Sequence, residues 1–187
     1  MASGLTECAV KMNSFEIKIL DFIRDNLSCR PLDVFFKYFT ELGGVEVMVA
    51  LILVLLMIKK TRHIGITAAI ALIMGIVFSN FVLKIIVDRI RPYEFNTAVS
   101  LVTAPEKDSS FPSGHSMSSI AMSLSVFFYN KKAGAVAIVA AVLIVFSRAY
   151  LYLHYPSDVL TGAFIGVLSA IAAKYITEKL LQKFPKL

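Results

Sequence analysis

The sequence predicts an all-α fold, a polytopic bundle of helices embedded in a membrane. Of the 187 residues, 57% are hydrophobic and only 17% are charged, and the mean hydropathy is +0.74. Apolar runs recur along the chain, separated by short polar or basic turns, which is the pattern of repeated membrane crossing. We therefore expect one integral-membrane domain over residues 1–187, with five to six spans and an N-terminal amphipathic helix.

The N-terminal part is the least apolar. Five charged residues interrupt the apolar ones between residues 14 and 28, so this segment predicts an amphipathic helix in the membrane interface; whether it is a sixth span is left open. Residues 31–39 form a second short amphipathic piece before the glycines at 43–44. Met12 could be the natural start, in which case residues 1–11 are an added leader; they do not resemble a cleaved signal peptide.

Five later segments are the expected spans. The second is uncharged and has the length that crosses about 30 Å of hydrocarbon. The third is rich in serine and small residues, and the fifth carries Gly162, Gly166 and Ala170 at four-residue intervals, a spacing that suits close helix packing. The expected spans are residues 45–58, 64–83, 114–129, 133–147 and 159–173.

The basic turns predict how the chain is oriented. Clusters at residues 59–63, at 130–132 and in the tail from residue 174 fall on one side of the expected bundle, and segments 84–113 and 154–158 fall on the other. By the positive-inside rule the basic side is cytoplasmic, so the other side is the extracytoplasmic face of the cell membrane. The net charge of +6 is dispersed among these turns, which argues against a nucleic-acid partner.

A corner between the last two apolar segments gathers ionisable residues. Arg148, His154 and Asp158 lie there, and ionisable groups at the edge of a span are costly enough to suggest function. Pro156 should end the first helix near His154, and Ser157 should cap the next helix with Asp158 in its first turn. We expect the Asp158 carboxylate to hold one imidazole nitrogen of His154 and to leave the other free to react.

Two further clusters are expected on the same side. Lys84 and Arg91 are seven residues apart, which on a continuous helix places both cations on one face. Ser113 is a candidate N-cap, and the backbone donors of Gly114 and His115 at that helix start form a candidate anion site. Each cluster alone has an ordinary structural explanation, such as snorkelling side chains or a capped helix start. Together, three cations, a helix N-terminus and two histidines on one side describe a phosphate site.

Metal and disulfide chemistry are not indicated. The two cysteines, Cys8 and Cys29, are too few to read as a disulfide framework, and no group of carboxylates or histidines has metal-ligand spacing. We therefore expect no metal ion and no other cofactor.

The order of these residues resembles a known family. The motifs are Lys-x6-Arg-Pro at residues 84–92, Pro-Ser-Gly-His at 112–115 and Ser-Arg-x5-His-x3-Asp at 147–158. All signature positions of the type 2 phosphatidic acid phosphatase family match in order, while the region before Lys84 carries no signature. The resemblance implies an all-helical membrane phosphatase without a metal cofactor, similar to the small bacterial undecaprenyl-diphosphatase and phosphatidylglycerophosphatase members. Vanadate-dependent haloperoxidases have similar motifs, but they are soluble and this composition argues against them.

The resemblance also implies a role for each signature residue. His154 would be the nucleophile that forms a phosphohistidine, Asp158 would orient and polarise it, and His115 would protonate the leaving group. Phosphoryl transfer depends mainly on positioning and charge neutralisation, which agrees with these residue types. The phosphoryl oxygens would be held by Lys84, Arg91, Arg148 and the turn of Ser113 and Gly114.

The leading hypothesis is an integral-membrane lipid phosphatase acting at the extracytoplasmic face, with undecaprenyl diphosphate as the first choice of substrate. Phosphatidylglycerophosphate, phosphatidic acid and a lipid A phosphate are alternatives, because the motifs recognise the phosphate and not the lipid. A phosphotransferase with an acceptor other than water is a second hypothesis. A non-catalytic binding protein or transporter subunit is a third, which the intact His154, His115 and Asp158 disfavour. The expected partners are the lipid phosphate and membrane lipids; the sequence indicates no oligomeric state.

Overall fold

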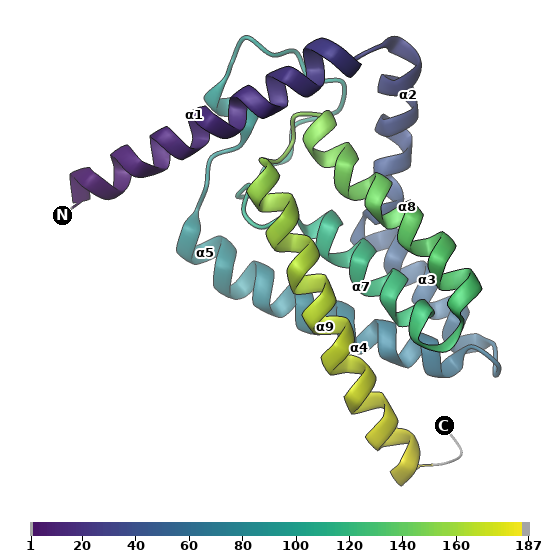
Figure 1. Cartoon of the computed structure of the whole chain (residues 1–187). Helices are drawn as coiled ribbons and strands as arrows, with labels where there is room; N and C mark the ends of the chain where they lie inside the picture. Colours follow the sequence, from purple (N-terminus) through teal and green to yellow (C-terminus); the bar gives the residue numbers. More distant parts are fainter. Residues whose placement is uncertain (1, 185–187) are drawn as a thin grey trace.

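The computed structural model describes residues 2–184, with side chains from residue 12 onward, and all regular structure in that part of the chain is helical (Figure 1). The predicted all-α fold is confirmed. The prediction that residues 1–11 are an added leader falls on residues whose side chains the structure does not describe. The elements are α1 (Ala2–Leu27), α2 (Arg30–Phe39), the 3-10 helix η1 (Thr40–Gly43), α3 (Val45–Met57), α4 (Arg62–Phe78), the π-helical turn η2 (Ser79–Leu83), α5 (Lys84–Val87), α6 (Pro92–Phe95), α7 (Gly114–Tyr129), α8 (Lys131–Tyr150) and α9 (Pro156–Lys183).

Helix α7 is the centre of the bundle, since it packs against α4, α8 and α9. Small residues of α9 allow its backbone to approach closely. A Cβ atom on Gly162 would lie 2.3 Å from the carbonyl oxygen of Ser113, and one on Gly166 would lie 2.5 Å from that of Met117. These contacts confirm the expected packing role of the small residues in the last span.

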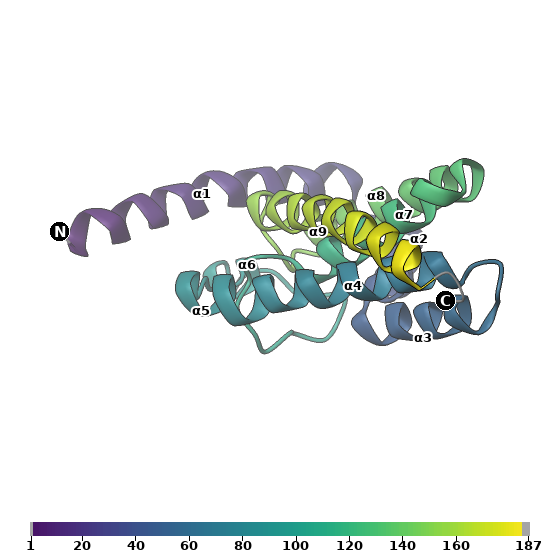
Figure 2. The same ribbon diagram turned by 90° about the horizontal axis from the view of Figure 1, so that it is seen from below.

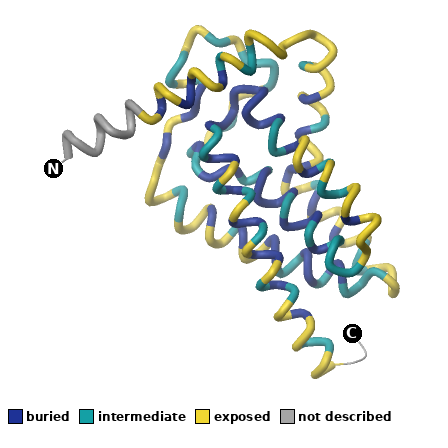
Figure 3. Tube along the Cα trace, in the orientation of Figure 1, coloured by how far each residue is buried: buried dark blue, intermediate teal, exposed yellow. Residues whose placement is uncertain are grey.

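Three helical stretches in the described part of the chain are long and apolar enough to cross a membrane: Arg62–Phe95, Lys131–Tyr150 and Pro156–Lys183. There are up to four if Arg30–Gly43 and Val45–Met57, which meet at a bend of 54°, form one broken span. The predicted number of five to six spans is therefore not confirmed. Helix α7 has only 16 residues and α3 only 13, and each is shorter than the ~20 residues of a typical span. The outward faces of the bundle are exposed (Figure 3) and carry large apolar side chains, as contact with lipid requires.

The basic turns lie together at one end of the bundle, as predicted. The rings of His63 and Tyr129 meet edge to face with centroids 4.6 Å apart. The Thr67 hydroxyl is 3.1 Å from the hydroxyls of both Tyr129 and Thr177. These contacts join the start of α4, the end of α7 and the last part of α9, next to the three basic clusters. The loops that precede α7 and α9 meet at the opposite end (Figure 1).

Helix α1 lies across this second end and contacts α8 and α9 (Figure 2). Its inner face buries Ile17 and Leu20 in a cluster with Tyr152 and Tyr155, while its outer face carries exposed apolar residues. The predicted helix is present, and its location in the membrane interface stays a prediction. One difference is that the charged residue Glu16 lies on the buried side, only 6% exposed.

Candidate active site

The three predicted clusters meet at a cavity of about 230 Å³. Five of the predicted site residues line it, namely Lys84, Arg91, Gly114, His115 and His154. The other predicted site residues, Ser113, Arg148 and Asp158, are almost completely buried behind its wall. The lining is completed by residues that no motif indicated: Gly43, Val45, Glu46, Asn80, Glu106 and Asp108.

The corner that carries His154 differs from its expected geometry. Helix α8 ends at Tyr150 and not near His154 as predicted. Tyr152 adopts a left-handed backbone with φ of 62°, a conformation that costs an L-residue about 1–2 kcal/mol. It turns the chain so that the amides of Leu153 and His154 both donate to the Arg148 carbonyl, at 3.1 and 3.2 Å. The helix is therefore terminated by this turn rather than by the proline.

The start of α9 also differs from the prediction. Its N-cap is Tyr155 and not Ser157. Pro156 takes the first helical position, where its fixed φ is favourable and its missing N–H costs nothing, so the cap falls on the residue before it. Asp158 is in the first turn, as predicted, and its carboxylate accepts the Tyr155 amide at 3.0 Å.

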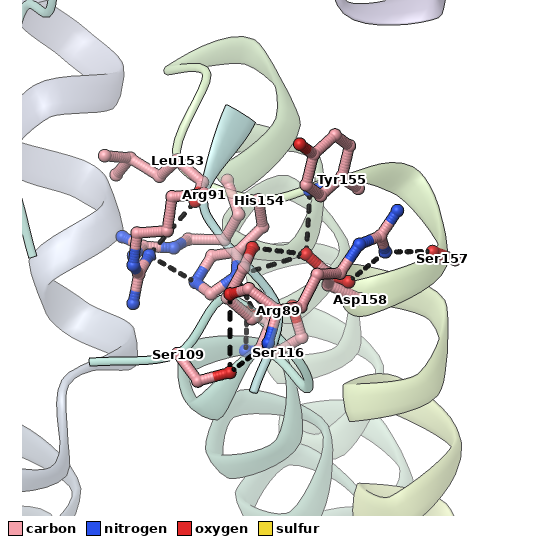
Figure 4. A network of polar contacts seen from close by, with 12 residues as sticks. Arg89, Arg91, Ser109, Ser116, Leu153, His154, Tyr155, Ser157 and Asp158 are labelled. Atoms are coloured by element: carbon pink, nitrogen blue, oxygen red, sulfur yellow. Dashed lines mark hydrogen bonds and ion pairs between the residues drawn. The ribbon is translucent and has the colours of Figure 1, made fainter. Parts of the chain in front are cut away.

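The imidazole of His154 is fixed from both of its nitrogens (Figure 4). Its Nδ1 atom is 2.7 Å from the backbone oxygen of Ser110, whereas the Asp158 carboxylate is 3.8 Å from Nδ1. The direct partner of Nδ1 is thus a carbonyl rather than the predicted carboxylate. Because a carbonyl can only accept, Nδ1 carries the proton and Nε2 keeps its lone pair. Nε2 lies 3.3 Å from Arg91 Nη1 and 3.7 Å from Glu106.

Asp158 is completely buried and is linked to His154 through Ser110. The Ser110 hydroxyl donates to Asp158 Oδ2 at 2.5 Å, while the carbonyl of the same residue accepts from the imidazole. Sequence reasoning missed Ser110 because it lies in a polar loop outside every motif. The carboxylate therefore acts on the ring by its charge and through this serine.

Lys84 and Arg91 reach the cavity by a different route from the one predicted. They do not share a continuous helix: α5 stops at Asp88, whose φ of 38° is left-handed, and Arg91 is extended as the N-cap of α6. Pro92 accounts for the extended backbone of Arg91, since the residue before a proline avoids the helical region. Both cations nevertheless converge, because Lys84 Nζ and Arg91 Nη2 both contact the Asp108 carboxylate, the latter at 2.5 Å.

Two carboxylates lie among the cations and bridge them. Glu106 bridges the two buried guanidinium groups: it is 2.6 Å from Arg91 Nη2 and pairs with Arg148 Nη2. Asp108 bridges Arg91 and Lys84. Each carboxylate offers two anionic oxygens to the same fork-shaped donors that recognise phosphate. The sequence does not predict their role, since nothing in the spacing of Glu106 and Asp108 indicates which residues they contact.

The surrounding charges change the pKa of the Glu106 carboxyl group. Burial alone would raise the pKa of its carboxyl group, but His154, Arg148 and Arg91 outweigh burial and hold the pKa well below the usual range. Glu106 is thus an anion under all ordinary conditions, and it neutralises part of the positive charge of the site.

Arg148 is 1% exposed. Besides its ion pair, it donates from Nη1 to the Thr40 hydroxyl at 3.0 Å. Its Nε atom is buried and has no partner among the described residues. A buried donor without a partner is costly, and this N–H remains able to donate to an anionic oxygen.

The start of α7 is capped as predicted. The Ser113 hydroxyl accepts from the backbone amide of Ser116 at 3.4 Å and from its hydroxyl at 3.0 Å. The Ser113 side chain is therefore committed to the cap. Gly114 is the open position, because a Cβ atom placed there would meet nothing within 4 Å. Its amide lies at a helix N-terminus, where an anion is favoured.

One further buried residue was missed. Arg89 follows the end of α5 and is 9% exposed, and its Nη1 donates to Asp158 Oδ1 at 2.5 Å. Only its position two residues before Arg91 distinguishes it in the sequence, and that spacing alone does not predict contact with a residue of α9.

Comparisons with known proteins agree with this geometry. Residues 63–182, which contain all three motifs, match the sequence profile of the PAP2 superfamily. An undecaprenyl-diphosphatase from Sulfolobus acidocaldarius is 29% identical over 153 residues, covering 81% of this chain and 73% of that protein.

Two solved structures are similar to the whole bundle. LpxE of Aquifex aeolicus aligns with a TM-score of 0.75 at 28% identity, over 83% of this chain and 92% of its own. The first transmembrane PAP2-type phosphatidylglycerolphosphate phosphatase of Bacillus subtilis aligns with a TM-score of 0.73 at 27% identity, over 90% of this chain and 87% of its own.

Proposed function

Because the chain belongs to the PAP2 superfamily, we propose that it hydrolyses undecaprenyl diphosphate at the extracytoplasmic face of the cell membrane, through a phosphohistidine formed on His154. Family membership makes the chain a membrane lipid phosphatase. The observation that carries the finer proposal is the position of the His154 Nε2 atom. It carries no proton and accepts a hydrogen bond from the Arg91 guanidinium, in a cavity lined by further cations.

The choice of lipid rests on similarity and on charge. The Sulfolobus acidocaldarius relative is named as an undecaprenyl-diphosphatase, and a diphosphate matches the three cations Lys84, Arg91 and Arg148. Phosphatidylglycerophosphate is the second candidate, because the Bacillus subtilis phosphatase of that name resembles 90% of this chain. Phosphatidic acid and a lipid A phosphate are further alternatives that the same cations would accept.

In the first step the terminal phosphoryl group replaces the two loop carboxylates among the cations, with one oxygen at the amide of Gly114. The His154 Nε2 lone pair attacks phosphorus. Burial and the Arg148 guanidinium lower the pKa of His115 in the empty site, so His115 takes up its proton only when the anionic phosphate is bound among the cations. A P–N bond forms, the P–O bond to the lipid phosphate breaks, and His115 gives this proton to the departing oxygen. The negative charge of Asp158 stabilises the ring, which becomes positively charged when Nε2 is phosphorylated while Nδ1 keeps its proton.

In the second step a water molecule attacks the phosphohistidine. His115, now neutral, takes a proton from this water, the P–N bond breaks, and inorganic phosphate leaves while His154 returns to its neutral form. The bound cations neutralise the charge of the phosphoryl oxygens in both steps, which is the main requirement of phosphoryl transfer.

Phosphate release from a panel of lipid phosphates, measured with purified protein in detergent and EDTA, tests the proposal. We expect the highest kcat/KM with undecaprenyl diphosphate. A higher kcat/KM with phosphatidylglycerophosphate would change the assigned substrate and leave the proposed phosphohistidine mechanism in place. Product that forms only when a second acceptor is added would instead identify a phosphotransferase.

A further inference from the structure

Arg89 joins two carboxylates that lie far apart in the sequence. Its Nη1 donates to Asp158 Oδ1 at 2.5 Å, and its Nη2 pairs with Glu16 of α1. Asn13 of α1 accepts from both Nε and Nη2, at 3.0 and 2.6 Å. The guanidinium also lies over the Tyr155 ring, 3.8 Å from its centroid. All of these side chains are buried, and none lines the cavity.

The charges of this group do not cancel. One guanidinium serves two carboxylates, so Arg89, Glu16 and Asp158 together carry a net charge of −1. Burying two carboxylates without the guanidinium would force one of them to take a proton. Arg89 thus keeps Asp158 ionised and fixes one of its oxygens, while the other faces His154 at 3.8 Å.

Helix α1 holds the guanidinium in place. Glu16 also accepts the backbone amide of Ser157 at 2.7 Å, and Arg89 donates to the Ser157 hydroxyl at 2.7 Å. The helix is therefore tied to the first turn of α9, which carries Asp158. This accounts for the burial of a glutamate on a helix whose pattern predicted a surface location.

We propose that Arg89, held by Asn13 and Glu16, is a positioning residue for phosphoryl transfer, so that α1 forms part of the active site. Arg89 does not touch the substrate. It sets the position of Asp158 and the negative charge behind the reacting imidazole. The inference rests on the proposed role of His154 as nucleophile, but not on which lipid is the substrate.

Several charged groups surround His154, and the test should leave each of them in place. Arg91 and Glu106 face Nε2, Asp158 faces Nδ1, and His115 lines the same cavity. Glu16→Gln leaves all four unchanged. It removes one negative charge from the buried group with almost no change in shape.

The test compares Glu16→Gln with Asp21→Asn. Asp21 lies on the same helix and accepts the Tyr152 hydroxyl at 2.7 Å, so its replacement perturbs the docking of α1 without reaching Asp158. The kcat/KM of each variant is measured against pH with the lipid phosphate that the unaltered protein hydrolyses fastest, so a wrong substrate assignment leaves the test intact. Glu16→Gln removes one negative charge from the buried group behind the imidazole, so the acid limb of the profile should move to lower pH by roughly half a unit. Asp21→Asn should show no shift.

Arg89→Lys provides a second measurement. Lysine keeps the charge but cannot reach Asn13, Glu16 and Asp158 together, so kcat should fall about tenfold. KM and the inhibition constant of inorganic phosphate should stay within about twofold, because Lys84, Arg91 and Arg148 are untouched. An unshifted profile in Glu16→Gln would overturn the inference, even if Arg89→Lys failed to fold. So would a phosphate inhibition constant that rose in proportion to the loss of kcat, since Arg89 would then act on the phosphate itself.

Discussion

At the scale of single residues, the two histidines of the cavity are held by different elements. His154 has Nδ1 committed to the Ser110 carbonyl, which leaves only Nε2 to react. His115 lies in the first turn of α7 beside the glycines that end η1. A Cβ atom on Gly43 would come 3.3 Å from His115 Cδ2, and one on Gly44 would come 3.8 Å from Nε2. The two rings therefore have different partners, as two separate roles require.

Substrates with different leaving groups distinguish the proposed roles of the two histidines. His154→Ala should remove essentially all turnover of both a lipid phosphate and p-nitrophenyl phosphate, and it should form no phosphoenzyme. His115→Ala should lose on the order of 10²–10⁴ in kcat with a phosphomonoester lipid, because an alkoxide needs the proton. The loss should be much smaller with the aryl ester, whose leaving group is already acidic. Turnover of the aryl ester by His154→Ala but not by His115→Ala would reverse the assignment.

At the scale of elements, the loop between α6 and α7 does more than connect two helices. It supplies the Ser110 carbonyl that binds His154. It also carries Glu106 and Asp108, the two carboxylates that form ion pairs with the cations of the site. Glu106 bridges Arg91 and Arg148, so a substrate phosphate has to compete with this loop for its binding groups. Removing one of these carboxylates should strengthen phosphate binding, because the competitor is gone. It should also destabilise the phosphate-free protein, because buried guanidinium groups then lack a partner.

Glu106→Gln should therefore bind inorganic phosphate more tightly, by about tenfold, and should have a lower Tm without phosphate. Thermal unfolding at increasing phosphate concentration measures both effects. Glu178→Gln, which removes only an exposed pair with Lys174, is the matched control. Weaker phosphate binding in Glu106→Gln would mean that the carboxylate helps to bind the substrate rather than competing with it.

The same carboxylate predicts a dependence of stability on pH. The pKa of Glu106 is lowered in the folded protein from an ordinary value of 4.5, so its stabilisation is fully present above that pH. The stabilisation is lost as the pH falls below 4.5 and the unfolded chain takes up the proton first. Between pH 5 and pH 3 the Tm of Glu106→Gln should fall less than that of the unaltered protein. Equal slopes in the two proteins would show that the ion pairs of Glu106 contribute nothing to stability.

At the scale of the whole molecule, the bundle has two chemically distinct ends. The basic turns share one end, tied together by His63, Thr67, Tyr129 and Thr177, and the cavity lies at the other. If the basic end is cytoplasmic, lipid phosphates of the outer leaflet reach the cavity.

Labelling of intact cells tests this orientation. After replacement of Cys8 and Cys29 by serine, Lys107→Cys should react with a membrane-impermeant thiol reagent, and Lys131→Cys should react only after the cells are opened. Both positions are exposed, so accessibility to the reagent reports the side of the membrane. Labelling of Lys131→Cys alone in intact cells would reverse the topology.

The set of cations also predicts turnover without a metal ion. Lys84, Arg91 and Arg148 supply the positive charge that a divalent ion would provide, and they would repel such an ion. EDTA should leave kcat and KM unchanged. Loss of turnover with EDTA, followed by recovery on adding magnesium, would contradict the proposed mechanism.

The class of the protein, and the set of residues that gather around the cavity, could be predicted from the amino-acid sequence. Composition alone separates a membrane bundle from a soluble domain, and the spacing of the motifs names the residues that meet at the cavity. Local features such as the Ser113 cap and the amphipathic α1 were predictable because they depend on neighbours within a few residues. The corner at Tyr152 and the break of the helix at Asp88 were not, since φ values there are set by the surrounding structure rather than by local preference.

The contacts between groups far apart in the sequence depend on how the helices pack. The Ser110 carbonyl replaces Asp158 as the direct partner of His154, and Arg89 connects Asp158 to Glu16. None of these contacts leaves a periodic signal in the chain, because each joins segments whose separation is fixed by the packing of whole helices. Hydrophobic patterning specifies that helices bury one face, but the burial of apolar area is non-directional. Which polar side chains become neighbours is settled only when the helices are packed and each buried charge has found its partner.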